Sequence, residues 1–496
     1  MILKRLFLLT GLALALFACR KETIISGTGV NLRFSTDTVY LDTVFTQIGS
    51  STYTLKVYND AEETVEIDNI RLGKPSSSFN INVNGKAVTS IENVQILPND
   101  SMYIFVEVNA PNAASAEYLL TDSIIFNNKD KEQFVQLVSL AREAKFIRPN
   151  RFLTSGSGDN LITIPYSIIP CDTSWSAGLP IVVYGYAVID EGCELAINPG
   201  VDVHFHNNSG LWVFNGGTLK VAEGNNPGGD SVTFQGDRLE PYYEDIPGQW
   251  GGVLGGIFID DSARAIINTA VIKNATTAIR LDSGQFNDQL NITNSYILNN
   301  SRVGLYGGYG KVNATNVVIA NAGVHLFYAF GGNYQFRHTT FANYWNQSTR
   351  QDPSVYLTNF IEVQTENGIE VVAREIEQCY FGNCIIDGIN RQEFVISEDE
   401  SRPLSYRFTN ALLKLNNDIE DRGFDVSDAD HFTQNTIYVN TASEFVNVEV
   451  NNYALDTASQ AVNVGNTSDA TQALDILGNF RNIGGLPDLG AIERQF

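Results

Sequence analysis

Apolar and polar residues alternate along the first third of the chain. Residues 102–108 are a clear example, because every second residue in them is apolar, and residues 64–70 follow the same alternation as far as Asp68. A period of two is typical of β-strands that bury one face, and Asn84-Gly85 is a strong signal for a two-residue hairpin turn. About seven such strands in succession predict an immunoglobulin-like β-sandwich over residues 31–143.

A second pattern, an apolar residue, any residue and then Asn, repeats between residues 269 and 343. Its asparagines, Asn274, Asn299, Asn321 and Asn343, are 25, 22 and 22 residues apart. A period in the low twenties with β-type composition marks a solenoid whose coils bury a core only by stacking. We expect these asparagines to form a ladder at an inward corner, each amide bonding to the coils above and below. The alternative is that each Asn marks an ordinary turn.

The pattern also predicts the limits of this solenoid. Strands of three to five residues, separated by turns rich in Gly and Asn, begin at residue 181, so we assign residues 181–496 to the solenoid. Residues 144–180 are a connecting and capping region in which Trp175 covers the first coil. An insertion interrupts the period near residues 344–374. Residues 453–496 are expected to close the last coils.

Short motifs add a resemblance to a known family. They are Asn215-Gly-Gly-Thr-Leu219, Gln249-Trp-Gly-Gly252, Asp475-x-x-Gly478-x-x-Arg481 and Pro487-Asp488-Leu-Gly490-Ala491-Ile-Glu493. These segments resemble right-handed parallel β-helix proteins of the pectate-lyase-like superfamily. The resemblance implies an all-β fold in which Asp475, Arg481, Asp488 and Glu493 form a structural cap, because an open solenoid end exposes strand edges.

The N-terminus carries a targeting signal. Lys4 and Arg5 precede an apolar run over residues 6–17 that is too short to span a bilayer comfortably. The sequence Leu16-Phe17-Ala18-Cys19 resembles a bacterial lipobox. This resemblance implies a signal peptide over residues 1–18, lipidation of Cys19 and a tether over residues 19–30, and it places the protein on the outer membrane of a Gram-negative cell, exposed at the surface. The alternative is an uncleaved secretory anchor.

Composition narrows the classes of function. The chain has 32 Lys and Arg residues against 56 Asp and Glu residues, a formal charge of −24. That balance argues against nucleic acid and against electrostatic docking on anionic lipid. Asp202, His204 and His206 alternate on one predicted outward face and could ligate a metal, but such residues usually form a solvated edge. We predict no cofactor and no metal site.

Four cysteines remain besides Cys19: Cys171, Cys193, Cys379 and Cys384. In an oxidising compartment they could pair as Cys171–Cys193 and Cys379–Cys384, although four cysteines allow three connectivities. Free thiols are also compatible with the sequence. The absence of a CxxC spacing argues against a thiolate zinc site or a redox motif.

The sequence identifies no catalytic set. A glycoside hydrolase needs two carboxylates that face the scissile bond, but Asp260-Asp261 is the only Asp-Asp pair in the coils, and adjacent strand residues point to opposite faces. A lyase needs a basic residue beside an acidic or metal cluster, and no such grouping is present. Whether the protein is an enzyme therefore stays open, and we assign no catalytic residue.

Aromatic residues give the better functional hint. Tyr306, Tyr309, Tyr328 and Tyr334 cluster over neighbouring coils, and Tyr306 and Tyr328 are one period of 22 residues apart. Exposed aromatic side chains suit sugars or a partner protein, although inward packing is the alternative. The sequence thus predicts a non-catalytic envelope lipoprotein that binds glycan or scaffolds an outer-membrane assembly, with a polysaccharide or a β-barrel protein as partner. A polysaccharide lyase or glycoside hydrolase is the alternative.

Overall fold

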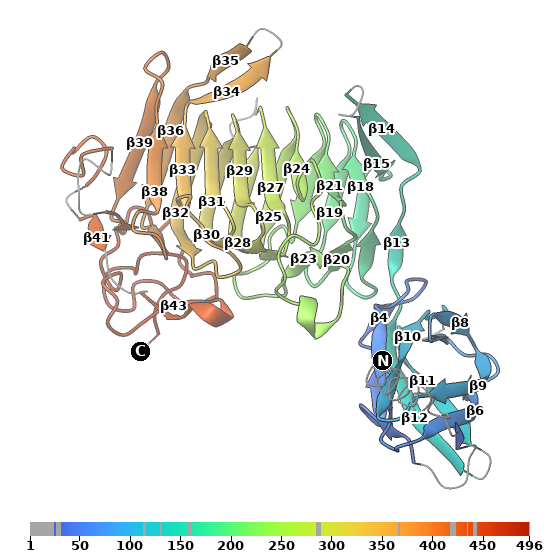
Figure 1. Cartoon of the computed structure of the whole chain (residues 1–496). Helices are drawn as coiled ribbons and strands as arrows, with labels where there is room; N and C mark the ends of the chain where they lie inside the picture. Colours follow the sequence, from blue (N-terminus) through green and yellow to red (C-terminus); the bar gives the residue numbers. More distant parts are fainter. Residues whose placement is uncertain are drawn as a thin grey trace, which may run out of the picture. The chain divides into compact units, whose positions relative to one another are not determined.

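The computed structural model describes residues 24–25, 31–112, 116–128, 131–156, 161–283, 289–365, 368–416, 423–433, 435–439 and 444–495. These residues form β-strands and two short 3-10 helices, Pro241–Tyr243 and Val448–Val450. Among them, no helix is long and apolar enough to cross a membrane. The chain divides into two compact units, Met1–Ala144 with Leu239–Pro241 and Lys145–Arg238 with Tyr242–Phe496 (Figure 1). The expected signal peptide, Cys19 and most of the tether lie outside the described residues.

The first unit consists of two sheets. One contains, in spatial order, β1 (Ile24–Ile25), β6 (Thr64–Leu72), β11 (Glu117–Asn128), β12 (Lys131–Arg142) and β3 (Thr38–Tyr40), with β4 (Val44–Phe45) on β12 and β9 (Ser90–Ile96) on β6. The other contains β2 (Arg33–Phe34), β5 (Tyr53–Asn59), β10 (Asp100–Val108), β7 (Phe79–Val83) and β8 (Lys86–Val88).

Alternation along these strands builds one core between the two sheets. Leu55 on β5 and Ile104 on β10 are fully buried, and they share a cluster with Ile67 and Phe126 of the other sheet. The expected hairpin turn at Asn84-Gly85 joins β7 to β8, and both of its residues have positive φ, 51° and 81°. Asn and Gly tolerate that backbone conformation, which a two-residue hairpin of this kind requires.

The second unit contains two long sheets, which we call together the parallel stack. The 17-stranded sheet is formed, in order, by β13 (Lys145–Ile147), β16 (Thr173–Trp175), β17 (Ile181–Val183), β19 (Glu194–Ile197), β20 (Asp202–Phe205), β22 (Thr218–Val221), β23 (Val232–Gly236), β25 (Arg264–Asn268), β26 (Ala270–Lys273), β28 (Leu290–Asn300), β30 (Lys311–Ala322), β32 (Gly332–Asn343), β36 (Ile376–Gly382), β37 (Ile385–Gly388), β39 (Leu404–Thr409), β40 (Leu412–Lys414) and β41 (Ile437–Val439). The 10-stranded sheet is formed by β14 (Arg151–Ser155), β15 (Ile162–Ile168), β18 (Tyr186–Ile189), β21 (Gly210–Val213), β24 (Ile257–Ile259), β27 (Thr277–Asp282), β29 (Val303–Gly308), β31 (His325–Phe330), β33 (Val355–Thr358) and β38 (Phe394–Ser397).

The chain visits the two sheets in turn, so each return places a new strand beside the previous one. Ile297, Ile319 and Phe341 are register partners on β28, β30 and β32, and they follow one another at 22-residue intervals. Inward side chains form buried rows; for example, Phe381 stacks on Phe336 at 5.3 Å and on Phe408 at 4.5 Å between ring centroids. The stack begins at Lys145 rather than at residue 181, because β13 and β16 already pair with β17 and β19.

A column of left-handed residues bends the long strands of the 17-stranded sheet. This corner column consists of Asn294, Asn316, His338, Asn383 and Asn410, which are in register from β28 to β40 and have φ of 49°, 56°, 45°, 53° and 50°. Asn adopts the left-handed region more readily than most residues, so its recurrence marks the corner. Asn316 donates to Asn294 (3.0 Å) and Asn294 donates to Asn268 (2.9 Å), which makes a continuous amide ladder.

The four asparagines of the repeat lie at a second corner. Asn321 Nδ2 donates to Asn299 Oδ1 at 3.2 Å, but Asn274 donates to the carbonyl of Glu244 and Asn343 exchanges hydrogen bonds with the backbone of Ala322. Of the expected ladder, only the direct amide contact between Asn321 and Asn299 is present. Asn274, Asn299 and Asn321 instead supply left-handed turns, with φ of 67°, 55° and 54°. The longer ladder lies at the other corner.

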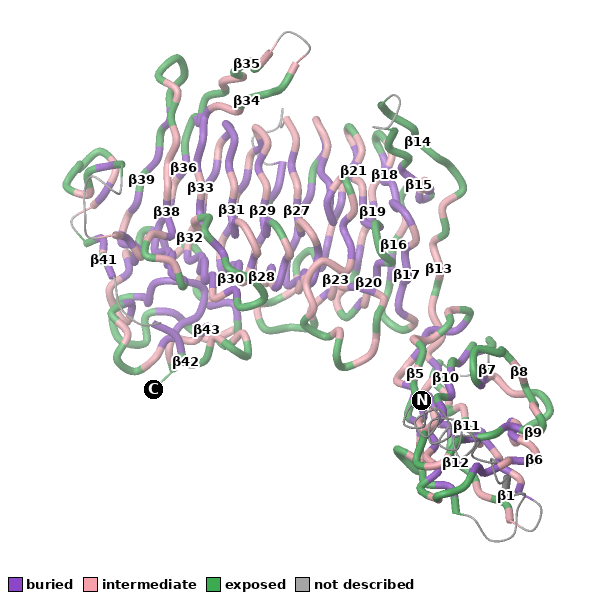
Figure 2. The backbone as a smooth tube through the Cα atoms, viewed as in Figure 1, coloured by how far each residue is buried: buried purple, intermediate pink, exposed green. Residues whose placement is uncertain are grey.

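The insertion is smaller than the expected residues 344–374. Its projecting part is the hairpin of β34 (Phe360–Thr365) and β35 (Gly368–Ala373), whose residues are exposed or half-buried (Figure 2). β33 belongs to the 10-stranded sheet. Arg350 and Glu393, both fully buried, hold the loop before β33 with Nη2 to Oε1 at 2.5 Å, and Ser354 Oγ donates to the same carboxylate at 2.6 Å.

The tail, residues 444–495, does not close the end of the stack. β42 (Phe445–Asn447), β43 (Asn452–Leu455) and the following loops pack against the outer face of the 17-stranded sheet, where Tyr453 and Leu489 meet Val318 and Ile385. Phe424 and Phe432, from the segment before the tail, join the inner core instead, and Phe432 stacks on Phe408 at 5.4 Å. The segment expected to cap the stack, residues 453–496, thus covers the outer face of the 17-stranded sheet instead.

Candidate ligand-binding site

One outward-facing row of side chains runs along the 10-stranded sheet. This outer row consists of Trp212, Phe258, Arg280, Tyr306, Tyr328 and Tyr356, which are register partners on the six successive strands β21, β24, β27, β29, β31 and β33. Each alternates with inward residues that are fully buried, such as Leu305 and Phe327. Because strand residues point to opposite faces in turn, the repeat of the coil brings these side chains together on the outer wall.

Neighbours in the outer row touch one another. The rings of Tyr306 and Tyr328 are 5.1 Å apart with planes 7° apart, and those of Tyr328 and Tyr356 are 5.6 Å apart. The guanidinium of Arg280 lies between Phe258 and Tyr306, 5.3 Å and 5.7 Å from their ring centres. Rings that stack in this way face each other, so their edges and hydroxyl groups point outward.

A groove of about 500 Å³ lies over the middle of the outer row. We call it the tyrosine groove; its lining is Gly252, Val253, Gly255, Thr276, Thr277, Arg280, Arg302, Val303, Tyr306, Val324, His325 and Tyr328. The lining residues come from the segment before β24 and from three successive strands, so the groove crosses the strands. Its long dimension therefore follows the direction in which the coils stack.

The tyrosine groove is rich in hydrogen-bond donors. Arg302 is exposed, and Arg280 pairs with Asp282 at 3.0 Å while its Nε is buried without a partner among the described residues. The described residues that line the groove include no carboxylate, in a chain whose formal charge is −24. Burial raises the pKa of Tyr328 to about 12.

The four candidate tyrosines do not form one site. Tyr306 and Tyr328 lie side by side in the groove. Tyr334 is fully buried, with its hydroxyl oxygen 2.6 Å from the carbonyl oxygen of Gly331 and 3.0 Å from that of Gly307, so its assignment as a ligand contact is wrong. Tyr309 lies apart from the groove at a turn, with φ of 66° and the guanidinium of Arg374 4.9 Å from its ring centre.

Sequence reasoning missed most of the outer row. Trp212, Phe258, Arg280, Tyr356 and the groove residue Arg302 were not singled out, because three of the five intervals between neighbours in the outer row depart from 22 residues. Arg280 precedes Tyr306 by 26 residues and Tyr356 follows Tyr328 by 28. The available signal was the alternation within each short strand, which marks one outward aromatic or cationic residue per coil.

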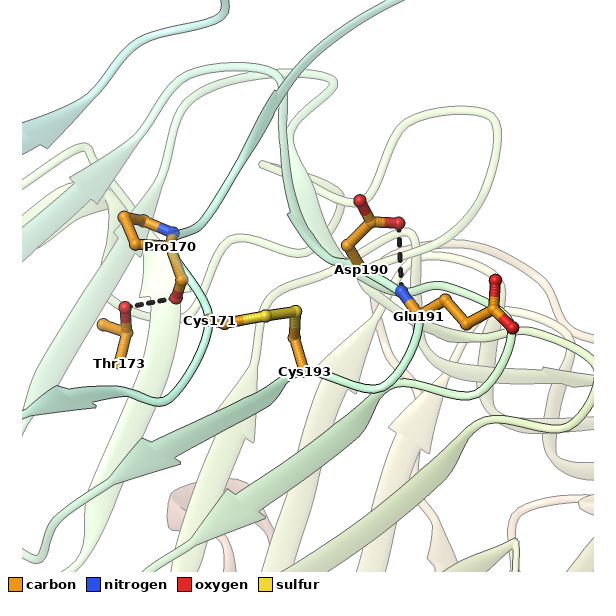
Figure 3. The surroundings of a disulfide bond; sticks show 6 residues. All are labelled: Pro170, Cys171, Thr173, Asp190, Glu191 and Cys193. Carbon is orange, nitrogen blue, oxygen red and sulfur yellow. Dashed lines mark hydrogen bonds between the residues drawn. A yellow bond between two sulfur atoms is a disulfide. The ribbon is translucent and has the colours of Figure 1, made fainter.

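The cysteines have different states. Cys171 and Cys193 form a disulfide that ties the turn after β15 to the start of β19 (Figure 3). Cys379 and Cys384 are free and buried, so a disulfide between them was a wrong candidate. The corner at Asn383 separates them: Cys379 lies in the inward row of Tyr334 and Tyr406, and Cys384 Sγ donates to backbone carbonyls.

Polar residues named in the sequence take structural positions. His204 is buried with Nδ1 3.0 Å from the carbonyl oxygen of Gly236, so it does not share an exposed face with His206. The described residues hold no group of three or more metal-ligating side chains.

The four ionisable residues of the tail are also structural. Asp475, Arg481, Asp488 and Glu493 are buried. Arg481 lies 3.6 Å from Glu493, and the carboxylates accept backbone N–H groups within the tail, among them those of Asn479 and Asn463. These contacts hold the loops of the tail in shape.

Comparison with known proteins leaves the family open. No protein-family model matches the chain, and no curated protein is similar to it in sequence. Solved structures similar to part of it include PapD-like domain 7 of human CEP192 (9% identity, 25% of this chain and 94% of that chain, TM-score 0.17), the E. coli chaperone DraB (14%, 30%, 72%, 0.17) and a family 123 glycoside hydrolase from Clostridium perfringens (9%, 24%, 28%, 0.17). Scores this low carry no argument about function.

Proposed function

We propose that the protein binds an extended glycan in the tyrosine groove without cleaving it. The observation that carries this proposal is the outer row, which sets one aromatic or cationic side chain on each of six successive coils. Strands in neighbouring coils are about 4.8 Å apart, so the row offers contacts at a regular interval. A linear polymer of similar repeat, lying along the stack, would meet Arg280, Tyr306 and Tyr328 one after another in the groove.

The chemistry of the groove supports a sugar ligand. Tyrosine hydroxyls, the guanidinium groups of Arg280 and Arg302, and the hydroxyl of Thr277 are suitable hydrogen-bond partners for sugar oxygens. The stacked rings present edges rather than faces, so we expect hydrogen bonds along the row to contribute more than ring-on-ring stacking. The lining offers no carboxylate pair for hydrolysis among the described residues, which favours binding over a hydrolase.

We also infer the fold of the two units and the location of the protein. We infer that the parallel stack is a right-handed β-helix of the pectate-lyase-like kind and that the first unit is an immunoglobulin-like module. Lipidation at Cys19 would anchor the chain to the outer membrane and hold the groove at the cell envelope. These inferences rest on the sequence motifs and on the strand order.

The test is binding to neutral and acidic polysaccharides, screened on a glycan array and measured by calorimetry with the purified protein. We expect the double variant Tyr306→Ala/Tyr328→Ala to weaken binding at least about tenfold, because both hydroxyls and the contact surface are removed. Tyr103→Ala is the matched control, since Tyr103 is an exposed tyrosine of the first unit. Equal binding by both variants, or release of new reducing or unsaturated ends, would overturn the proposal. Circular dichroism checks that each variant is folded.

A further inference from the structure

A second row of polar side chains lies at the ends of four strands in the 17-stranded sheet. Ile147, Val183, Phe205 and Gly236 are register partners on β13, β17, β20 and β23. The residue after each is Arg148, Tyr184, His206 and Asp237 respectively. Backbone hydrogen bonds carry the register one residue further, from Tyr184 N to Ile147 O (2.9 Å), His206 N to Val183 O (3.0 Å) and Asp237 N to Phe205 O (3.0 Å).

The middle of this row is a positioned imidazole. His206 Nδ1 lies 2.7 Å from Asp237 Oδ2, and the Asp237 side chain is 9% exposed, whereas that of His206 is 47% exposed. Tyr184 stacks on the other side of the imidazole, with 4.4 Å between ring centres. The ring is thus fixed from two sides, and its Nε2 has no partner among the described residues. The carboxylate of Asp237 raises the pKa of His206, which favours a protonated, donating ring.

These residues open onto a cleft of about 570 Å³. Arg148, Tyr184 and His206 line it together with Thr163, Asn207 and Asn208, all of which can donate hydrogen bonds. The described lining has no carboxylate, because Asp237 lies behind His206. The cleft is separate from the tyrosine groove, with which it shares no residue.

We propose that this cleft binds a small molecule through an oxyanion, a phosphate or carboxylate group, held between Arg148 and His206. A guanidinium and a protonated imidazole are charge-assisted donors, and the neighbouring amides and hydroxyls complete the coordination of the oxyanion. The charged and titratable groups around His206 are Asp237, Tyr184 and Arg148. The inference is independent of glycan binding at the tyrosine groove.

The test uses the full chain with ¹⁵N-labelled histidine, because the protein has only five histidines. Inorganic phosphate and acetate are titrated separately at constant ionic strength while the imidazole ¹⁵N signals are recorded. We expect saturable shifts of the His206 signals, assigned with His206→Gln, and a rise of the pKa of His206 with anion concentration. Saturation by phosphate or by acetate supports the site and identifies the class of oxyanion.

Two controls make the test decisive. His431 lies 3.9 Å from Asp428 but outside the cleft, so its signals should not saturate. Arg148→Met should weaken binding by roughly tenfold, whereas Arg391→Met, which removes an exposed arginine elsewhere, should leave it unchanged. Absence of saturation at His206, equal shifts at His431, or equal binding by the two arginine variants would overturn the proposal.

Discussion

At the residue scale, the corner column has two roles. Its members adopt left-handed backbone, and the side chains of all but Asn294 also anchor the tail. Asn383 Nδ2 donates to the carbonyl of Asn466 and Asn410 Nδ2 to that of Val464, both at 2.8 Å. Asn316 accepts from Arg481 at 2.8 Å. An amide can satisfy a turn and a second segment at once because it carries both donors and an acceptor.

His338 is the exception in this column, and its protonation should control stability. Asn383 Nδ2 lies 2.9 Å from His338 Nε2, so Nε2 accepts, and Nδ1 donates to the carbonyl of Gly490 at 3.2 Å. Burial, with the charge of Arg481, holds the pKa of His338 well below its usual value. As pH falls below about 6.5, His338 becomes protonated in the unfolded chain but stays neutral in the folded protein. The contribution of the neutral His338 to the free energy of unfolding is therefore fully present above that pH and decreases below it.

We predict that His338→Asn removes this part of the pH dependence. Asn suits the left-handed position, as its column neighbours show. Between pH 7 and pH 5.5 the free energy of unfolding should decrease more steeply in the wild type than in the variant. The difference between the two slopes should reach up to about 1.4 kcal/mol per pH unit. Urea unfolding at each pH measures the difference. Burial raises the pKa of Asp488 and Glu493, which acts in the opposite direction at lower pH and is common to both proteins. Identical slopes would contradict the assignment.

At the element scale, each strand of the stack is stabilised by the strands that pair with it. The β34–β35 hairpin pairs only with itself and projects from the stack. Its exposed apolar residues are Val363, Ile369 and Val371. At its base, the backbone N–H of Arg374 donates to the carbonyl of Asn359 at 2.6 Å, so the coil is already closed before the hairpin begins. An isolated two-stranded hairpin is only marginally stable in water and contributes little to its host.

We predict that the hairpin can be removed without loss of stability. Residues 360–373 would be replaced by Gly-Gly between Asn359 and Arg374. The midpoint of thermal unfolding should stay within about 2 °C of the wild type, since few buried contacts are lost. Glycan binding should also be unchanged, because the tyrosine groove is formed by earlier strands. A large decrease in the midpoint would show that the hairpin stabilises the stack.

At the scale of the whole molecule, the two units have separate cores. The core of the first unit includes Leu55, Ile67 and Ile104, and the inner core of the second includes Ile297 and Phe336. No residue belongs to both clusters. Units without a shared core usually unfold separately.

Calorimetry should therefore show two transitions. Unfolding enthalpy scales with the number of residues, so the smaller transition belongs to the first unit. Ile104→Ala, which creates a cavity in that core, should lower only the smaller transition, at a cost of about 2–5 kcal/mol. Ile297→Ala should lower only the larger one. A single transition that both variants shift would mean that the units unfold together.

The sequence predicted the parts of the fold that repeat at constant intervals. Tyr306 and Tyr328 could be placed as neighbours because the coils between them are regular. Arg280 and Tyr356 could not, since loops of different length break the count. Tyr334 was misplaced although Val312, 22 residues earlier, is an inward residue in the same register row. The path of the tail was not predictable, because it depends on contacts as distant in sequence as Arg481 and Asn316.

The tail also limits how this protein can change in length. Solenoids grow or shrink by whole coils, since an added coil only extends each row by one position. Here Asn316, Asn383 and Asn410 are each bonded to a fixed point of one continuous tail. A coil duplicated between β30 and β39 would pull those points apart, so that region is fixed in number. The tail also lies against the loop after β22, where a Cβ added to Gly228 would meet the carbonyl oxygen of Leu477. The coils before β22 carry no such constraint from these contacts, and duplications there would lengthen the outer row without separating the points at which the tail is attached.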